Sequence, residues 1–327
     1  MKTLKKQNAI FKIGKILAII PGNRAQKTYS VIYFTVLTIS VSLTYIYRKP
    51  FYLKFNLLKL LIKIAIDVTC YGFNFYTTVI VTCYKGRAWK LLLQNLGKFE
   101  DKKSNFSVVL FAITNLVFWA LTVFTGWVWL TVIGVEYSRQ YIFDVVQLYP
   151  LIYYNYLIVV FLKKIQDGLN SLKVSLNRNF ESIEPKIWIL RASIEHFNQI
   201  FAWPILFIIM YSYLRVLIYI DLTFRHGIKN LKLVAVIDNI CIILLFVGGV
   251  VAMIIKCDNV RCELQEIARV LYTSSSTSPR IKILFYLVQD FPQISAARFF
   301  IIGRATIFKI LSSICSFCIV LSQFSLK

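Results

Sequence analysis

Residues Leu233–Ile255 read LVAVIDNICIILLFVGGVVAMII, and Asp238 is the single charged residue in this run. A helix that crosses the hydrocarbon core of a bilayer needs about 20 mostly apolar residues, each rising about 1.5 Å. We therefore expect this run to span a membrane. Similar runs are found at Tyr29–Tyr47, Leu57–Tyr84, Val108–Gly134, Tyr141–Leu162, Ile200–Ile220 and Ala305–Phe324.

The composition agrees with a chain that is solvated by lipid. Apolar residues make up 58% of the 327 residues, whereas soluble domains contain about half. No Gly/Ser/Pro-rich linker divides the chain, and no internal repeat is visible. The sequence thus predicts an all-α, polytopic membrane protein with seven transmembrane helices. Residues 1–28 precede the first span, and 29–327 form one transmembrane domain.

The distribution of Lys and Arg predicts the orientation. Basic residues gather in segment 1–28 and in the segments after the second, fourth and sixth spans, and they are sparse in the others. Because basic loops stay on the cytoplasmic side, we expect a multi-pass plasma-membrane protein whose N-terminus is cytoplasmic and whose C-terminus is outside. This topology also accounts for the net charge of +23, so we expect membrane lipid as a partner and no nucleic acid.

Two inner segments carry apolar residues at helical spacing. Ile165, Leu169, Leu172 and Leu176 form one such stripe, and Leu264, Ile267 and Leu271 form another. We expect the fourth, fifth and sixth helices to continue below the membrane and to pack together as a cytoplasmic anchor, about 163–199 and 256–298. The alternative is amphipathic helices that lie on the membrane surface.

Residues that could carry catalysis are scarce. The two histidines, His196 and His226, lack neighbours spaced for metal binding or for activating a nucleophile. No phosphate-binding loop, dinucleotide fingerprint or zinc-protease motif is present. Cys315 and Cys318 lie in an apolar run, where a thiol behaves as a small hydrophobe. We expect no enzyme activity, no cofactor and no metal site.

Ionisable residues within the spans are more informative, because each costs roughly 2.5–3.5 kcal/mol at the centre of a bilayer. Lys59, Lys63 and Asp67 share one helix face, and Lys63 could pair with Asp67. Arg215 could likewise meet Asp238. Such pairs either hold the bundle together or line a water-filled outer pocket.

Aromatic residues, 16% of the chain, are dense in the outer halves of spans three to five. A concave site with aromatic walls and a few polar groups is typical of small-molecule binding. The predicted ligand-binding residues are Trp119, Thr122, Gln147, Tyr149, Tyr153, Tyr211 and Asn239.

The last run, 305–324, carries a polar stripe. Ser312, Ser316, Ile319 and Gln323 recur on one helix face. Such a stripe should face protein or water instead of lipid. Around a symmetry axis it would line a pore, and Ile319 with Gln323 would form the narrowest ring.

The same run resembles a known signature. Ser316-Phe317, five residues and Gln323-Phe324 keep the spacing of the last-span motif of insect gustatory receptors, Thr-Tyr, five hydrophobic residues and Gln-Phe. Ser-Phe replaces Thr-Tyr here, so Phe317 lacks the family's hydroxyl. Phe197-Asn198-x-x-Phe201 and Phe299-Phe300 are similar to further family patterns.

This resemblance implies a ligand-gated, non-selective cation channel. It implies a homotetramer, or a heteromer with related subunits, whose last helices line the pore, with Gln323 and Phe324 at the gate. It implies a small tastant as ligand, held in an outer-half pocket. The alternatives are a G-protein-coupled receptor, whose Asp-Arg-Tyr and Asn-Pro-x-x-Tyr motifs are missing, and a transporter, for which Lys63 and Asp67 are the main support.

Overall fold

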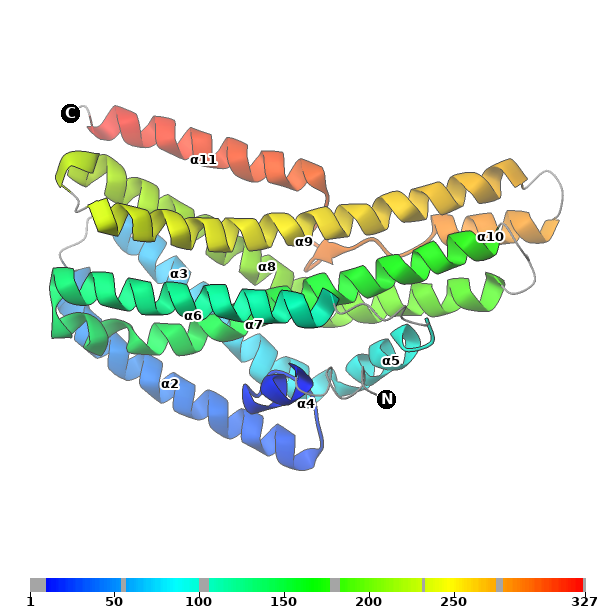
Figure 1. Ribbon diagram of the computed structural model, residues 1–327, viewed down its shortest axis with the longest axis horizontal. Helices are drawn as coiled ribbons and strands as arrows, with labels where there is room; N and C mark the ends of the chain where they lie inside the picture. Colours follow the sequence, from blue (N-terminus) through cyan, green and yellow to red (C-terminus); the bar gives the residue numbers. More distant parts are fainter. Residues whose placement is uncertain are drawn as a thin grey trace.

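The computed structural model describes residues 10–53, 57–99, 106–176, 183–230, 233–274 and 279–325. Its elements form a helical bundle with one small pair of strands (Figure 1). The elements are α2 (Arg24–Tyr52), α3 (Leu57–Phe75), the π-helix η1 (Tyr76–Val81), α4 (Thr82–Tyr84), α5 (Gly86–Leu96), α6 (Phe106–Ile133), α7 (Val135–Leu176), α8 (Ile183–Asn230), α9 (Leu233–Ser274), α10 (Pro279–Gln289), β1 (Ser295–Ala296), β2 (Phe300–Ile301) and α11 (Arg304–Ser325).

Six of the seven predicted spans coincide with helices that could cross a membrane. Within the described part of the chain, six helical segments are long and apolar enough to cross a membrane, and each overlaps a predicted span. The span Leu57–Tyr84 is built from α3, η1 and α4 in succession. The seventh predicted span lies on α11, which has 22 residues and runs along α8 and α9 at the edge of the bundle (Figure 1). The predicted all-α polytopic fold is confirmed, while its orientation across the membrane stays a prediction.

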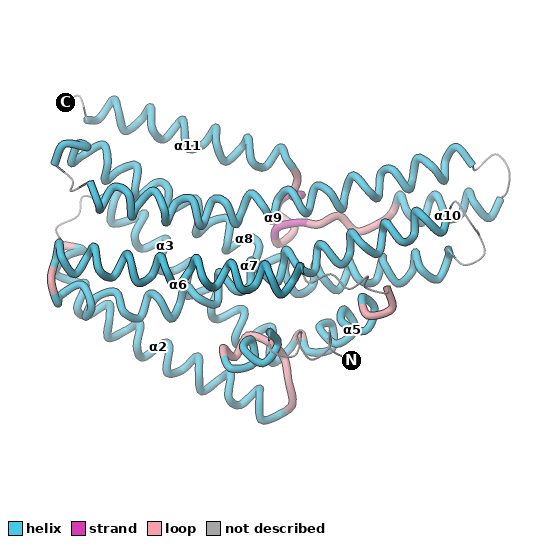
Figure 2. Tube along the Cα trace, in the orientation of Figure 1, coloured by secondary structure: helices cyan, strands magenta, loops and turns pink. Residues whose placement is uncertain are grey.

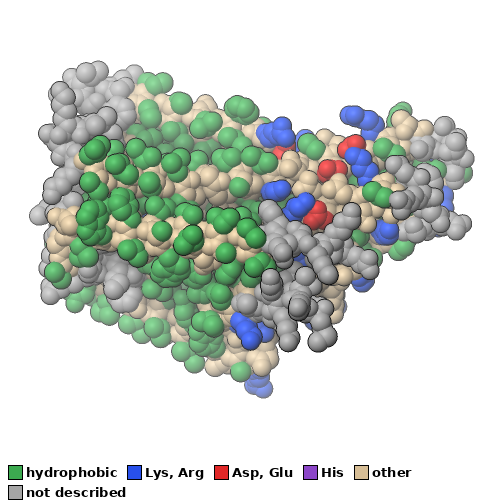
Figure 3. Space-filling view, in the orientation of Figure 1, with side chains coloured by type: hydrophobic (Ala, Val, Ile, Leu, Met, Phe, Trp, Pro, Cys, Tyr) green, Lys and Arg blue, Asp and Glu red, His purple; other side chains and the backbone are tan. Residues whose placement is uncertain are grey.

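One half of the molecule has an apolar surface, as a bilayer requires. In the space-filling view, hydrophobic side chains cover the half that holds α2, α6 and the start of α9, whereas charged side chains gather over the other half (Figure 3). On α6, Leu116, Val123 and Trp127 are exposed. Only 6% of the residues in the apolar stretch of this helix are buried inside the bundle. Most of its surface is therefore available to lipid.

The other half is built from extensions of the spans. Helix α7 has 42 residues, α8 has 48 and α9 has 42, so each continues well past a membrane-crossing length. The stripe of Ile165, Leu169 and Leu172 is fully buried, as are Ile267 and Leu271. These stripes therefore pack inside a helical bundle, while the cytoplasmic placement of the anchor stays a prediction.

Some elements of this half were not expected from the sequence. Helix α5 buries Ala88, Trp89, Leu92 and Leu96 between other helices. Helix α10 is followed by an antiparallel strand pair that leads into α11 (Figure 2). Ala297 turns this hairpin at a positive φ of 48°, and its backbone N–H donates to the Ala202 carbonyl of α8, 3.0 Å away. The hairpin thus fixes the start of α11 against α8.

Residues 10–23, which precede the first long helix, contact α7. Tyr153 of α7 donates to the carbonyl of Ile10 (2.7 Å), and Tyr154 donates to that of Ile19 (3.1 Å). Ala18 and Ile19 are fully buried. The first long helix begins at Arg24, earlier than the predicted Tyr29, so the described part of segment 1–28 packs into the bundle.

Candidate functional site

A cavity of about 280 Å³ lies between α3, α6, α7, α8 and α9. Its walls are mostly apolar, with a few charged and hydroxyl groups. The lining residues are Lys59, Lys63, Phe118, Leu121, Thr122, Thr125, Trp129, Asp144, Val145, Leu148, Arg215, Ile218, Tyr219, Ile242, Leu245 and Phe246. An apolar cavity with few polar groups is the common form of a small-molecule site.

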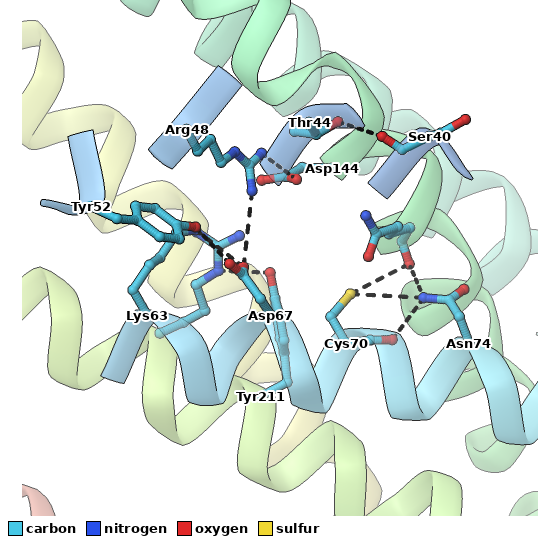
Figure 4. Close-up of polar contacts among 12 residues, drawn as sticks. Ser40, Thr44, Arg48, Tyr52, Lys63, Asp67, Cys70, Asn74, Asp144 and Tyr211 are labelled. Carbon is cyan, nitrogen blue, oxygen red and sulfur yellow. Dashed lines mark hydrogen bonds and ion pairs between the residues drawn. The ribbon is translucent and has the colours of Figure 1, made fainter. Parts of the chain in front are cut away.

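A buried ionic network lies beside the cavity (Figure 4). The Arg48 Nη2 atom is 2.6 Å from Asp144 Oδ1, and Arg48 Nη1 is 4.0 Å from Asp67 Oδ1. Lys63 Nζ lies 3.5 Å from Asp67 Oδ1, and Tyr52 donates to Asp67 Oδ2 over 2.6 Å. The predicted pair of Lys63 and Asp67 is confirmed. It belongs to a larger cluster that joins α2, α3 and α7.

Arg48, Asp144 and Tyr52 are the members of this network that were not predicted from the sequence. The predicted first span ended at Tyr47, which left Arg48 outside it. Instead α2 continues to Tyr52 and buries the Arg48 side chain. An acidic residue on the fourth span, Asp144, was the available signal, because a carboxylate in a membrane helix needs a partner.

Arg215 projects into the cavity from α8. Its Nε donates to the Tyr211 hydroxyl over 2.6 Å, and its guanidinium carbon lies 5.2 Å from the Tyr211 ring centroid. The predicted pairing with Asp238 is wrong, because Asp238 accepts from Thr125 Oγ1 (2.6 Å) and Trp129 Nε1 (3.0 Å). No carboxylate of the described residues forms an ion pair with Arg215.

Two of the predicted ligand-binding residues are associated with the cavity. Thr122 lines it, and its hydroxyl donates to the Phe118 carbonyl (2.8 Å). Tyr211 is fully buried and orients the lining residue Arg215.

The other five are not among the cavity's lining residues. Trp119 stacks on Tyr149 but is 47% exposed on the outer surface of α6. Tyr149 donates to Asn115 Oδ1 (2.6 Å), and Tyr153 is buried against the N-terminal segment, away from the cavity. The backbone carbonyl of Gln147 accepts a hydrogen bond from the side-chain amide Nδ2 of Asn74 (3.2 Å). Asn239 is buried, and its Oδ1 has no hydrogen-bond partner in the described part of the chain.

The predicted pore residues lie on α11. Ile307, Ile310, Ile314 and Phe317 of this helix pack against the core of the bundle, and Ser313 hydrogen-bonds Tyr213 of α8 (2.7 Å). At about 100° per residue, the stripe of Ser312, Ser316 and Ile319 falls on the opposite side, and all three are exposed. Gln323 and Phe324 belong to α11, but their side chains lie outside the described ones.

One acidic residue ties α11 to the cavity-lining helix α9. Asp258 Oδ2 is 2.7 Å from Arg304 Nε, and Asp258 Oδ1 accepts from the Arg304 backbone N–H (3.4 Å). The Asp258 side chain is 12% exposed. The first turn of α11 is therefore fixed to the same helix that supplies Ile242, Leu245 and Phe246 to the cavity.

Within the described residues, no group of three or more His, Cys, Asp or Glu side chains could hold a metal ion.

The comparisons with known proteins bear on the fold. No protein-family model matches this sequence, and no curated protein matches it. The structure is similar to that of the insect olfactory receptor OR5 from Machilis hrabei, with a TM-score of 0.70 and 13% identity over 99% of each chain. The same receptor in complex with eugenol gives a TM-score of 0.69 at 13% identity, over 99% of this chain and 100% of the other. The chain therefore has the fold of an insect olfactory receptor.

Proposed function

We propose that this chain is a subunit of a small-molecule-gated cation channel of the insect chemoreceptor type. The observation that carries the proposal is the cavity between α3 and α6–α9, in a fold that a receptor solved with a small ligand, eugenol, shares from end to end. The gustatory motif around Gln323-Phe324 favours a tastant receptor within this group. No specific observation favours the G-protein-coupled receptor or the transporter.

The ligand that fits the cavity has a mostly apolar body and one acceptor or anionic group. Phe118, Leu148 and Phe246 offer apolar contacts, which favour burial of a hydrocarbon or aromatic ring. Arg215 offers a guanidinium that neighbouring hydroxyls hold in place without neutralising it. A carboxylate would complete that site, because hydrogen bonds between charged partners are about twice as strong as those between neutral groups.

The pore is assigned to α11. Its apolar face is occupied by α8 and α9, and the face with Ser312, Ser316 and Ile319 is left for water and for other subunits. Four copies around an axis, as a homotetramer or with related subunits, would make this face the lining of a pore in the plasma membrane. Gln323 and Phe324 would follow it toward the outer mouth.

Gating would run through α9. A ligand that binds more tightly when the cavity walls take their open-state positions biases the whole bundle toward that state. Because Asp258 of α9 holds the start of α11, a shift of α9 reaches the pore helix directly. The buried stripes of α7–α9 would serve as the anchor that holds the subunits on the cytoplasmic side.

The proposal is tested by filling the cavity. Leu245 lines it, whereas the next residue, Leu244, is 65% exposed on the surface of the same helix. In cells that express the chain, we expect eugenol, phenylacetate or 2-phenylacetamide to evoke a cation current. Leu245→Trp should abolish the response, because the indole occupies the ligand's space, and Leu244→Trp should preserve it.

Equal responses of the two variants, both normally present at the cell surface, would overturn the assignment of the cavity. The absence of any current from the unsubstituted chain across the three probes and their acid, alcohol and amide analogues would argue against a channel.

A further inference from the structure

A second, larger cavity of about 780 Å³ lies where the N-terminal segment meets the end of α4 and the start of α5. It shares no lining residue with the ligand cavity. Its walls are formed by Phe11, Lys15, Ile20, Pro21, Gly22, Lys27, Cys83, Tyr84, Gly86, Arg87, Trp89, Lys90 and Leu93.

The charge on these walls has one sign. Lys15, Lys27, Arg87 and Lys90 line the cavity, and all four side chains are exposed. The sequence has no acidic residue before Asp67 and none from 85 to 99. No carboxylate from either wall therefore neutralises this site, in contrast to the paired charges of the network around Arg48.

The walls are held in fixed positions. On one side, Gln26 Nε2 donates to the Lys15 carbonyl and the Tyr29 hydroxyl donates to the Ile16 carbonyl, each over 2.7 Å. On the other side, the Trp89 ring packs against Phe161 and Phe201, with ring centroids 5.7 and 5.6 Å away. The four cations thus project from a folded frame, which lowers the entropic cost of bringing them to one ligand.

The cavity also lies beside apolar surface. Ile16 and Tyr84 flank its walls and are 66% and 75% exposed. A simpler explanation of these Lys and Arg residues is that loops on the cytoplasmic side of any polytopic membrane protein are basic. That rule accounts for scattered charges, but not for four cations around one walled cavity next to exposed hydrophobic side chains.

We propose that this cavity binds the phosphorylated headgroup of an anionic membrane lipid, with the phosphates on Lys15, Lys27, Arg87 and Lys90 and the acyl chains along Ile16 and Tyr84. The volume and the four cations fit a headgroup that carries more than one phosphate, as in a polyphosphoinositide. Basic pockets on the cytoplasmic side of membrane proteins bind such headgroups. The proposal rests on the cytoplasmic placement of segment 1–28 and is independent of the ligand-gated current.

The experiment measures lipid binding to the purified full chain in detergent by native mass spectrometry. The probes are dioctanoyl phosphatidylinositol 4,5-bisphosphate, dioctanoyl phosphatidylcholine and free inositol 1,4,5-trisphosphate. The variant combines Lys15→Gln, Arg87→Gln and Lys90→Gln. The matched control combines Lys98→Gln, Arg269→Gln and Lys282→Gln, which removes the same charge from exposed residues outside the cavity.

We expect the bisphosphate lipid to bind and the phosphatidylcholine not to bind. The cavity variant should lose about a hundredfold in affinity and the control less than about threefold, given the contribution of each base near an anionic lipid. Equal losses in the two variants would overturn the proposal, because they would indicate general electrostatic attraction. Binding of free inositol trisphosphate as tight as that of the lipid would also overturn it, in favour of a soluble phosphate ligand.

Discussion

At the scale of single residues, most charged side chains inside the membrane-spanning bundle form ion pairs with one another. Arg48, Lys63, Asp67 and Asp144 neutralise one another across three helices. The Lys63–Asp67 pair could be predicted, because four residues of one helix separate the partners. The Arg48–Asp144 pair could not, because 96 residues separate them and their proximity depends on how α2 packs on α7.

Arg215 differs from these residues, and the difference is testable. Replacing it with Met removes the charge and keeps much of the volume. We expect Arg215→Met to lower sensitivity to phenylacetate by about ten- to a hundredfold, the range of a hydrogen bond to a charged group. The response to 2-phenylacetamide, which has the same ring and no charge, should change little. Dose–response curves of the evoked current measure both.

A uniform loss for the acid and the amide would mean that Arg215 supports the cavity wall through Tyr211 and does not select the ligand.

At the scale of elements, the long helices were predictable and the short connecting elements were not. The stripe from Ile165 to Leu176 has the period of a helix, so the extension of α7 below the span follows from the sequence. Helix α5 is short, and its buried face depends on partners contributed by α7 and α8. The cavity is lined by side chains from five helices, and the sequence does not show how these helices pack. For this reason Thr122 is the one predicted ligand-binding residue that lines it.

The contact between α9 and α11 gives a prediction at this scale. Asp258→Asn removes the charge that holds Arg304 while keeping the shape of the side chain. We expect the maximal evoked current to fall severalfold, because movement of α9 no longer reaches the pore helix. Binding of the probe ligand to the purified chain should be unchanged, since Asp258 does not line the cavity. Asp167→Asn, which removes an ion pair with Lys163 on the surface, is the matched control.

A normal maximal current in Asp258→Asn, or a loss of equal size in Asp167→Asn, would contradict this route of coupling.

At the scale of the whole molecule, the fold was accessible from the sequence although identity to a solved receptor is only 13%. The number and length of the spans follow from the lengths of the hydrophobic runs. The distribution of Lys and Arg among the loops predicts how the spans are oriented across the membrane. The face of α11 with Ser312, Ser316 and Ile319 points away from its own bundle. A single chain leaves this face uncovered, so the proposed pore would form only where several subunits assemble.

The most direct test of the channel is the accessibility of the two faces of α11. In a background with Cys315→Ala and Cys318→Ala, Ser316→Cys places a thiol on the predicted pore face, and Ile314→Cys places one on the face that packs against α8 and α9. A cationic methanethiosulfonate reagent is applied while the probe ligand evokes current. We predict progressive block in Ser316→Cys and none in Ile314→Cys. Block of Ile314→Cys with Ser316→Cys unaffected, or no ligand-evoked cation current in the unsubstituted chain, would contradict the assignment of α11 to the pore.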